Sequence, residues 1–169
     1  MNQKIQDAFN AHLNAEMYSS YFYLSMSAYL ESGNLKGMAN WMRIQAQEEM
    51  THVMKFYDFI HDRDGQVILT AIEGPKTEWN SPLEIFEEAL AHERLVSGLI
   101  NDLVDLAMAE KDHMAVTFLQ WFVTEQVEEE ANVKEIVDKM KMVGDNGVAR
   151  FMLDGELSQR APVPAEPTV

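Results

Sequence analysis

Glu49 and His52 are the two side chains whose types and spacing most suggest chemistry. They stand three residues apart in the run 47–52, and on a helix this spacing places both on one face. Residues at steps of three and four extend that face as a mostly apolar stripe, formed by Leu35, Met38, Met42, Gln45, Phe56 and Phe59. Because a buried carboxylate and a buried imidazole need a compensating partner, the pattern indicates either a bound cation or a buried Glu–His hydrogen bond.

Five segments of the chain have the hydrophobic periodicity of helices. The periodicity predicts helices over about 3–31, 35 to 62 or 63, 81–110, 115–143 and 148–157. Gly33 is expected to follow the first helix in the left-handed conformation. Ser81-Pro82-Leu83-Glu84 is a capping box with proline at the first helical position, and therefore marks the start of the third helix.

The connection over 64–80 is long enough to allow one crossover along the bundle. A helix of about 28 residues spans about 42 Å, and this connection can extend to roughly 55 Å. The second and third helices can then run parallel, while the first pair and the last pair are antiparallel. The predicted fold class is all-α, a four-helix bundle with one long crossover and a short fifth helix. This domain is expected to cover 1–160, with a disordered, proline-rich tail over 161–169.

Three further glutamates, Glu16, Glu93 and Glu129, interrupt the apolar stripes of the other long helices. With the helical rise per residue, these carboxylates and that of Glu49 all lie about 20–25 Å from the same end of the bundle. Four uncompensated charges would protonate or repel the bundle open, so we expect multivalent cations there, with His52 beside them. Oxygen ligands with one imidazole suit two close iron or manganese ions, although the sequence does not separate these from zinc.

The composition of the chain excludes several other classes of site and partner. Its 169 residues contain 28 Asp and Glu against 13 Lys and Arg, for a formal net charge of −15, and no cysteine. Nucleic acid is therefore not an expected partner, and thiolate metal sites are ruled out. Neither a signal peptide nor an apolar run of membrane-spanning length is apparent, so we expect a cytoplasmic protein without membrane contact.

Up to about Arg160, the chain resembles the bacterial and archaeal non-haem ferritins, which belong to the ferritin-like di-iron family. The matching segments, which are specific in combination, are Asn14-Ala15-Glu16-Met17-Tyr18-Ser19-Ser20, Gln45-Ala46-Gln47-Glu48-Glu49-Met50-Thr51-His52, His92-Glu93, Phe118-Leu119-Gln120-Trp121-Phe122 and Glu125-Gln126-Val127-Glu128-Glu129-Glu130. The resemblance implies a ferroxidase centre whose first iron is held by Glu16, Glu49 and His52. It implies a second iron bridged by Glu49 and completed by Glu93 and Glu129, with Gln126 nearby. It further implies that Tyr23 lies close to the centre and that a third iron binds at Glu48, Glu125, Glu128 and Glu129.

The resemblance also implies an activity and an assembly. Fe(II) would be oxidised by dioxygen or peroxide at the paired site, and Fe(III) would be deposited as a mineral inside a homo-oligomeric shell of 24 subunits. The short fifth helix would leave its own bundle for a symmetry axis, with an apolar stripe of Val148, Phe151, Met152 and Leu157. Two alternatives remain open, a di-iron peroxidase without storage and a redox-inactive buffer of divalent metals.

A few other residues bear on the limits of the site. Met50 falls where bacterioferritins place a haem-binding methionine, but we expect it to pack at the bundle surface or a subunit interface, and we expect no haem. His12, His61 and His113 have no carboxylate partner at a spacing that suggests ligation. Trp121 lies one turn before a predicted ligand and could contact the site.

Overall fold

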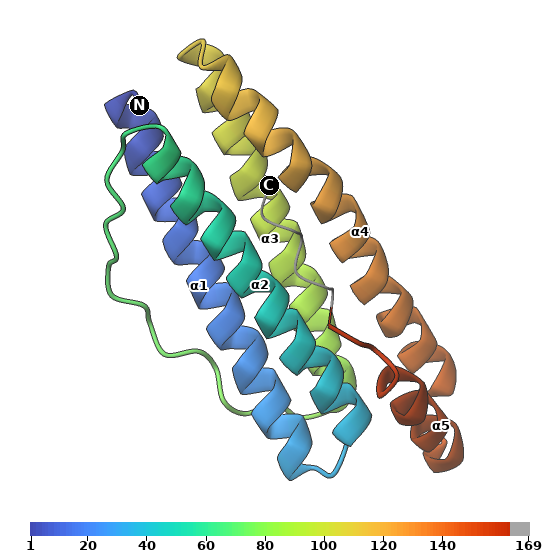
Figure 1. Ribbon diagram of the computed structural model, residues 1–169. Coiled ribbons are helices and arrows are strands. Elements are labelled where there is room, and N and C mark those ends of the chain that lie inside the picture. Colours follow the sequence, from blue (N-terminus) through green and yellow to red (C-terminus); the bar gives the residue numbers. More distant parts are fainter. Residues whose placement is uncertain (163–169) are drawn as a thin grey trace.

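The structure of the protein, a computed structural model, describes residues 1–162 as a bundle of long helices with one short helix at its end (Figure 1). In chain order the helices are α1 (Gln3–Ser32), α2 (Lys36–Asp62), α3 (Pro82–Ala109), α4 (His113–Val143) and α5 (Gly147–Leu157). The described residues contain no strand, and the predicted all-α class is confirmed. None of these helices has the length and apolar character needed to cross a membrane. The tail predicted over 161–169 lies, from residue 163 onward, outside the described residues.

Side-chain caps begin three of the long helices. Asn2, Ser81 and Asp112 each accept a hydrogen bond, of 2.8–3.1 Å, from a backbone amide two or three residues later. Such bonds satisfy amide groups that the first turn of a helix leaves without an intrahelical partner. The predicted start at Ser81 is confirmed, although the Glu84 carboxylate reaches back to the Asn80 amide at 2.7 Å, one residue before the cap.

Three helices are followed by a residue other than glycine in the left-handed conformation. Asn34, Asp64 and Lys111 have φ angles of 59°, 54° and 56°. After α1, the Leu35 amide donates to the carbonyl five residues earlier at 3.0 Å, which is the outer bond of a Schellman motif. The prediction for Gly33 is wrong, because its φ is −81°. α1 continues through Ser32, which moves the left-handed position to Asn34, a residue type that tolerates it.

The connection between α2 and α3 follows the outer side of α1 from one end of the bundle to the other (Figure 1). Asn10 of α1 holds its beginning, because the side-chain amide donates to the Gln66 carbonyl at 2.9 Å and accepts from the Ile68 amide at 2.7 Å. Further along, Ser25 donates to the Lys76 carbonyl at 2.7 Å. α2 and α3 therefore run parallel, and the predicted single crossover is confirmed.

The bundle core consists of two apolar halves with a polar layer between them. One half includes Phe9, Phe56 and Phe122, and the other includes Met38 and Phe86. Each long helix contributes to both halves and places buried polar residues at the level between them, namely Glu16, Gln45, Glu49, His52, Glu93, Gln126 and Glu129. The four carboxylates predicted to meet at mid-height are all in this layer.

α5 packs against its own bundle. Leu153 and Leu157 are buried in the adjoining half of the core, and the Asp154 carboxylate accepts a hydrogen bond from the Met38 amide at 2.9 Å, near the start of α2. Gly37 makes this close approach possible, because a Cβ there would lie 1.7 Å from the Asp154 carbonyl oxygen.

The apolar stripe predicted for the fifth helix is therefore wrong as a single face. Leu157 is buried with Leu153, whereas Val148, Phe151 and Met152 are exposed. The two faces separate because a helix of eleven residues can anchor one side on its own bundle and still present apolar residues on the other. The expectation that the fifth helix leaves its own bundle is also wrong, because Leu153 and Leu157 are buried in that bundle.

Candidate metal centre

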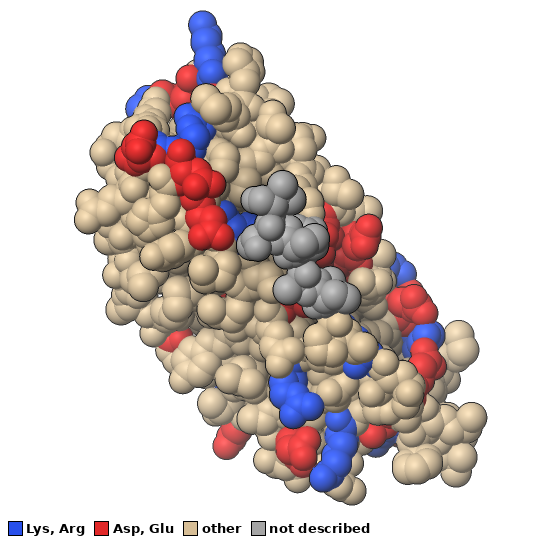
Figure 2. Space-filling model, viewed as in Figure 1, with Lys and Arg blue, Asp and Glu red and all other residues tan. Residues whose placement is uncertain are grey.

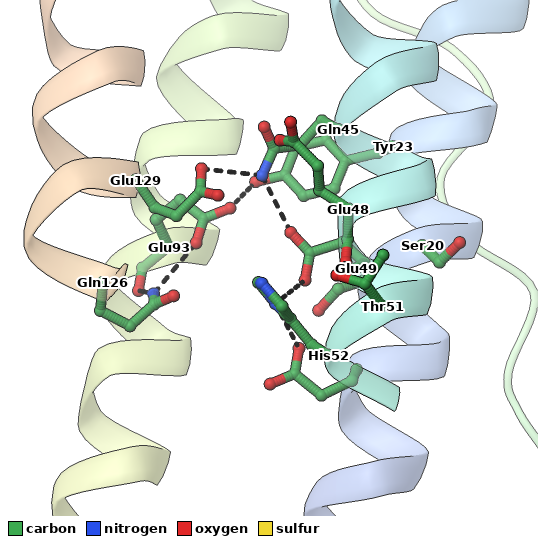
Figure 3. A network of polar contacts seen from close by, with 12 residues as sticks. Ser20, Tyr23, Gln45, Glu48, Glu49, Thr51, His52, Glu93, Gln126 and Glu129 are labelled. Carbon is green, nitrogen blue, oxygen red and sulfur yellow. Dashed lines mark hydrogen bonds and ion pairs between the residues drawn. The ribbon is translucent and has the colours of Figure 1, made fainter. Parts of the chain in front are cut away.

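Glu16 of α1, with Glu49 and His52 of α2, forms the first half of the polar layer. All three are buried, and Glu16 is only 1% exposed. His52 Nδ1 lies 3.3 Å from Glu49 Oε2 and 4.0 Å from Glu16 Oε2. One ligand atom from each residue lies within 4.8 Å of the others, so one metal ion could contact all three. Figure 3 shows Glu49 and His52 projecting from the same side of α2.

Glu93 of α3 and Glu129 and Gln126 of α4 form the second half, across the layer from α2 (Figure 3). The Gln126 amide donates to the Glu93 carboxylate and to the Glu93 backbone carbonyl, each at 3.1 Å. Tyr23 of α1 donates its hydroxyl to the other carboxylate oxygen of Glu93. Hydrogen bonds from two helices therefore fix the orientation of Glu93 in the absence of a cation.

Gln45 joins the two halves. Its Nε2 donates to Glu49 Oε1 at 3.0 Å and to Glu129 Oε2 at 2.8 Å, so carboxylates from α2 and α4 approach the same amide group. The sequence placed Gln45 in the buried stripe of α2 but not in the site. Its position one turn before Glu49 was the available signal.

His12 is a second residue that sequence reasoning missed. His12 Nε2 lies 2.8 Å from Glu16 Oε1, with both side chains buried, so the prediction that His12 has no carboxylate partner is wrong. The spacing of four residues places both side chains on one face of α1, and this signal was present in the sequence. By holding one oxygen of Glu16, His12 leaves the other directed toward the layer.

The second oxygen of Glu16 supports the fit of this donor set to a cation. Glu16 Oε2 is buried and has no hydrogen-bond partner among the described residues. Leaving a buried charged acceptor unsatisfied costs on the order of 1–3 kcal/mol or more, and a metal ion held by Glu16, Glu49 and His52 would satisfy it. Carboxylate oxygens with one imidazole nitrogen suit iron and manganese, whereas a closed thiolate site would favour other metals.

The electrostatics of the layer also favour the binding of a cation. Burial lowers the pKa of His52, but the hydrogen bond and charge of Glu49, with the charge of Glu16, outweigh it and raise that pKa to about 10. Burial, followed by repulsion from Glu49, raises the pKa of Glu129 to about 7. The same causes, with Glu129 added, raise the pKa of Glu93 well above its ordinary value. Without a cation the layer retains protons, which incoming metal ions would displace.

Of the glutamates implied for a third iron, Glu129 is in the buried layer, whereas Glu48, Glu125 and Glu128 are more exposed. Glu125 joins His52 and Glu129 in a second group whose ligand atoms lie within 4.8 Å of one another. Glu48 is partly buried and paired with a guanidinium group, while Glu128 is exposed. The structure thus brings Glu125 close to the primary residues, pairs Glu48 with Arg160 and leaves Glu128 exposed to solvent.

Two other expectations concern the surroundings of the centre. The Trp121 ring stands edge-on to His52 with ring centroids 5.5 Å apart, which confirms the predicted contact. Met50 is 40% exposed, which confirms that it lies at the bundle surface.

Known proteins resemble this chain along almost its whole length. A family model described as a ferritin-like domain matches residues 6–143. A bacterial non-heme ferritin of Bacteroides fragilis (strain 638R) is 48% identical over 160 residues, covering 95% of this chain and 99% of the relative. A bacterial non-heme ferritin of Staphylococcus saprophyticus is 39% identical over 161 residues, covering 95% and 96%.

Solved structures agree with the sequence relatives. An open pore ferritin from the hyperthermophilic archaeon Archaeoglobus fulgidus is 49% identical, with a TM-score of 0.94 over 95% of this chain and 99% of that chain. A humanized archaeal ferritin is 48% identical, with a TM-score of 0.96 over 97% and 99%. The family model spans most of the chain, and the relatives share both its sequence and its fold. The resemblance to non-haem ferritins is confirmed, and the chain belongs to the ferritin family.

Proposed function

We propose that this ferritin oxidises Fe(II) to Fe(III) at the polar layer and stores the product as a ferric mineral. The observation that carries the proposal is the buried group of Glu16, Glu49 and His52, in which one carboxylate oxygen has no hydrogen-bond partner among the described residues. Two further buried carboxylates with raised pKa values, Glu93 and Glu129, complete the layer. Multivalent cations are the partners that compensate such a concentration of charge.

Fe(II) is the substrate, and the residues divide between two ions. Glu16 and His52 hold the first, Glu49 bridges, and the second is held by Glu93 and Glu129, with Gln126 nearby. Anionic oxygen ligands stabilise the higher charge of Fe(III), which lowers the reduction potential and favours electron transfer to dioxygen or peroxide. The Tyr23 hydroxyl orients Glu93 for this role.

Storage requires a cavity that a single bundle does not enclose. We therefore propose a closed homo-oligomeric shell of 24 cytoplasmic subunits, in which the exposed apolar face of α5 lies at a symmetry axis. A third iron site at Glu48, Glu125, Glu128 and Glu129 would receive iron next to the primary pair. The acidic excess of the chain would concentrate Fe(II) near its surface.

Anaerobic loading with Fe(II), followed by addition of oxygen, tests the proposal. Ferric absorbance should develop rapidly, and repeated loading should leave far more iron in the shell than its ligand residues can bind. Retention of only a few irons per chain would indicate a di-iron peroxidase. Absence of ferric absorbance would indicate a redox-inactive metal buffer.

A further inference from the structure

The segment that follows α5 returns along α2 and brings Arg160 to the seam between α2 and α4. The Asn40 side chain donates to the Arg160 carbonyl at 3.2 Å, and the guanidinium group lies 4.1 Å from the centre of the Trp41 ring. A second donor of the same guanidinium reaches the Trp41 carbonyl at 3.3 Å. With its side chain 17% exposed, Arg160 occupies a position built by several contacts.

The remaining contacts of Arg160 connect it to the metal centre. Its Nη2 donates to Gln45 Oε1 at 2.8 Å and to the Glu48 carboxylate. Because Arg160 takes the oxygen end of the Gln45 amide, the nitrogen end faces Glu49 and Glu129, to which it donates. Figure 3 shows Gln45 between these carboxylates, with Glu48 on the same helix. One residue therefore separates Arg160 from two proposed iron ligands.

The seam at this point has space on its α4 side. No Cα atom of α2 lies within 8 Å of one in α4 in the described helices, so side chains fill the interval. An open pocket of about 270 Å³ lies between α2, α4 and α5, and its lining includes Arg160, Trp41 and Ile136. Acidic and basic side chains alternate along the α4 side of this face (Figure 2). A guanidinium released from Glu48 could move into this pocket, whose lining also includes Glu135 and Glu156.

We propose that Arg160 is an internal counter-ion that occupies the Glu48 position of the third iron site and must leave before a cation binds there. The Glu48 oxygen that accepts from the guanidinium has its charge already paired, so a cation that binds at this oxygen must compete with Arg160 for it. The segment after α5 thus controls occupancy of the outer site without supplying a ligand to the primary pair. This inference rests on the proposed function, because it assumes the two primary cation sites.

Titration calorimetry of the assembled, iron-free protein with Zn²⁺ tests the role of Arg160 without any redox reaction. R160Q removes the charge, and R150Q is the matched control, because Arg150 pairs with Asp145 at 3.7 Å, away from Glu48. We expect the wild type and both variants to bind two equivalents of Zn²⁺ tightly. The third equivalent should bind about 10- to 100-fold more tightly to R160Q than to the wild type, whereas its affinity for R150Q should equal that for the wild type. In an E48Q background, the same R160Q change should produce no gain.

An unchanged third equivalent in R160Q, or an equal gain in R150Q, would overturn the proposal. Absence of the two tight equivalents in the wild type would instead overturn the proposed function. Tryptophan fluorescence supplies a measurement on the unmodified chain. Release of the guanidinium from Trp41 should change the emission during the third Zn²⁺ equivalent, in addition to any change that Trp121 beside His52 reports during the first two, and W41F should lack this third change. Identical emission changes in the wild type and W41F during the third equivalent would contradict displacement.

Discussion

Replacing Glu129 with glutamine should stabilise the cation-free protein at alkaline pH. Glu129 has its pKa raised from an ordinary 4.5 to about 7 by burial and by Glu49. The folded state therefore binds more protons than the unfolded state between these values, and stability falls as the pH rises through that window. A tenfold change in proton affinity corresponds to about 1.4 kcal/mol, so ionised Glu129 costs the folded state about 3 kcal/mol at pH 8. At pH 5 the cost is less than about 1 kcal/mol, because the folded carboxyl is still protonated.

Calorimetric melting in the presence of a chelator measures this difference. The E129Q protein should melt about 6–12 °C above the wild type at pH 8. At pH 5 its melting temperature should exceed that of the wild type by only a few degrees. The Gln45 amide can still donate to the carbonyl oxygen of the new side chain, so the hydrogen bond at 2.8 Å is retained. E128Q is the matched control, since Glu128 is one residue away and exposed, and its melting temperature should not change.

Addition of Zn²⁺ should reverse the order of stability. A cation at 1,000 times its dissociation constant stabilises the wild type by about 4.1 kcal/mol, which exceeds the advantage of E129Q at pH 8, and E129Q should lose this contribution at the second site. An E129Q protein that melts no higher than the wild type at pH 8 without metal would refute the electrostatic reasoning. Equal stabilisation of both proteins by Zn²⁺ would refute the placement of Glu129 among the ligands.

Three further predictions concern the centre and the fifth helix. Glu49→Ala should abolish fast Fe(II) oxidation in stopped-flow absorbance while circular dichroism stays unchanged, and wild-type kinetics in this variant would exclude Glu49 as the bridging ligand. Glu48→Gln should preserve the first oxidation turnover but change the oxygen consumed per iron in later turnovers; loss of the first turnover would place Glu48 in the primary centre. Gly37→Ala should destabilise the chain by about 1–3 kcal/mol, because its Cβ would meet the Asp154 carbonyl oxygen at 1.7 Å, whereas Gly98→Ala, with nothing within 4 Å, should not. An equal melting temperature for both glycine variants would contradict the packing of α5 on α2.

Local patterns in the sequence were sufficient for the helices and for predicting that the proposed primary ligands share one layer. Helical periodicity depends on neighbours three and four residues apart, so it places Glu49 and His52 on one face whatever the rest of the chain does. The stripes interrupted by Glu16, Glu93 and Glu129 then meet at one level, because the rise per residue of a helix is constant. His12 could have been included by the same rule, since it stands four residues before Glu16.

Contacts between distant segments were decided only by the tertiary structure. Arg160 bonds to Gln45 across 115 positions of sequence, and nothing in the residues around Arg160 indicates that its side chain enters the seam. The face of α5 that is buried depends on the close approach of Asp154 to Gly37, which periodicity within a helix of eleven residues does not specify. The position of Gln45 between Glu49 and Glu129 likewise depends on the separation of α2 and α4. Such contacts are set by the distances between packed helices, and local sequence patterns carry no information about those distances.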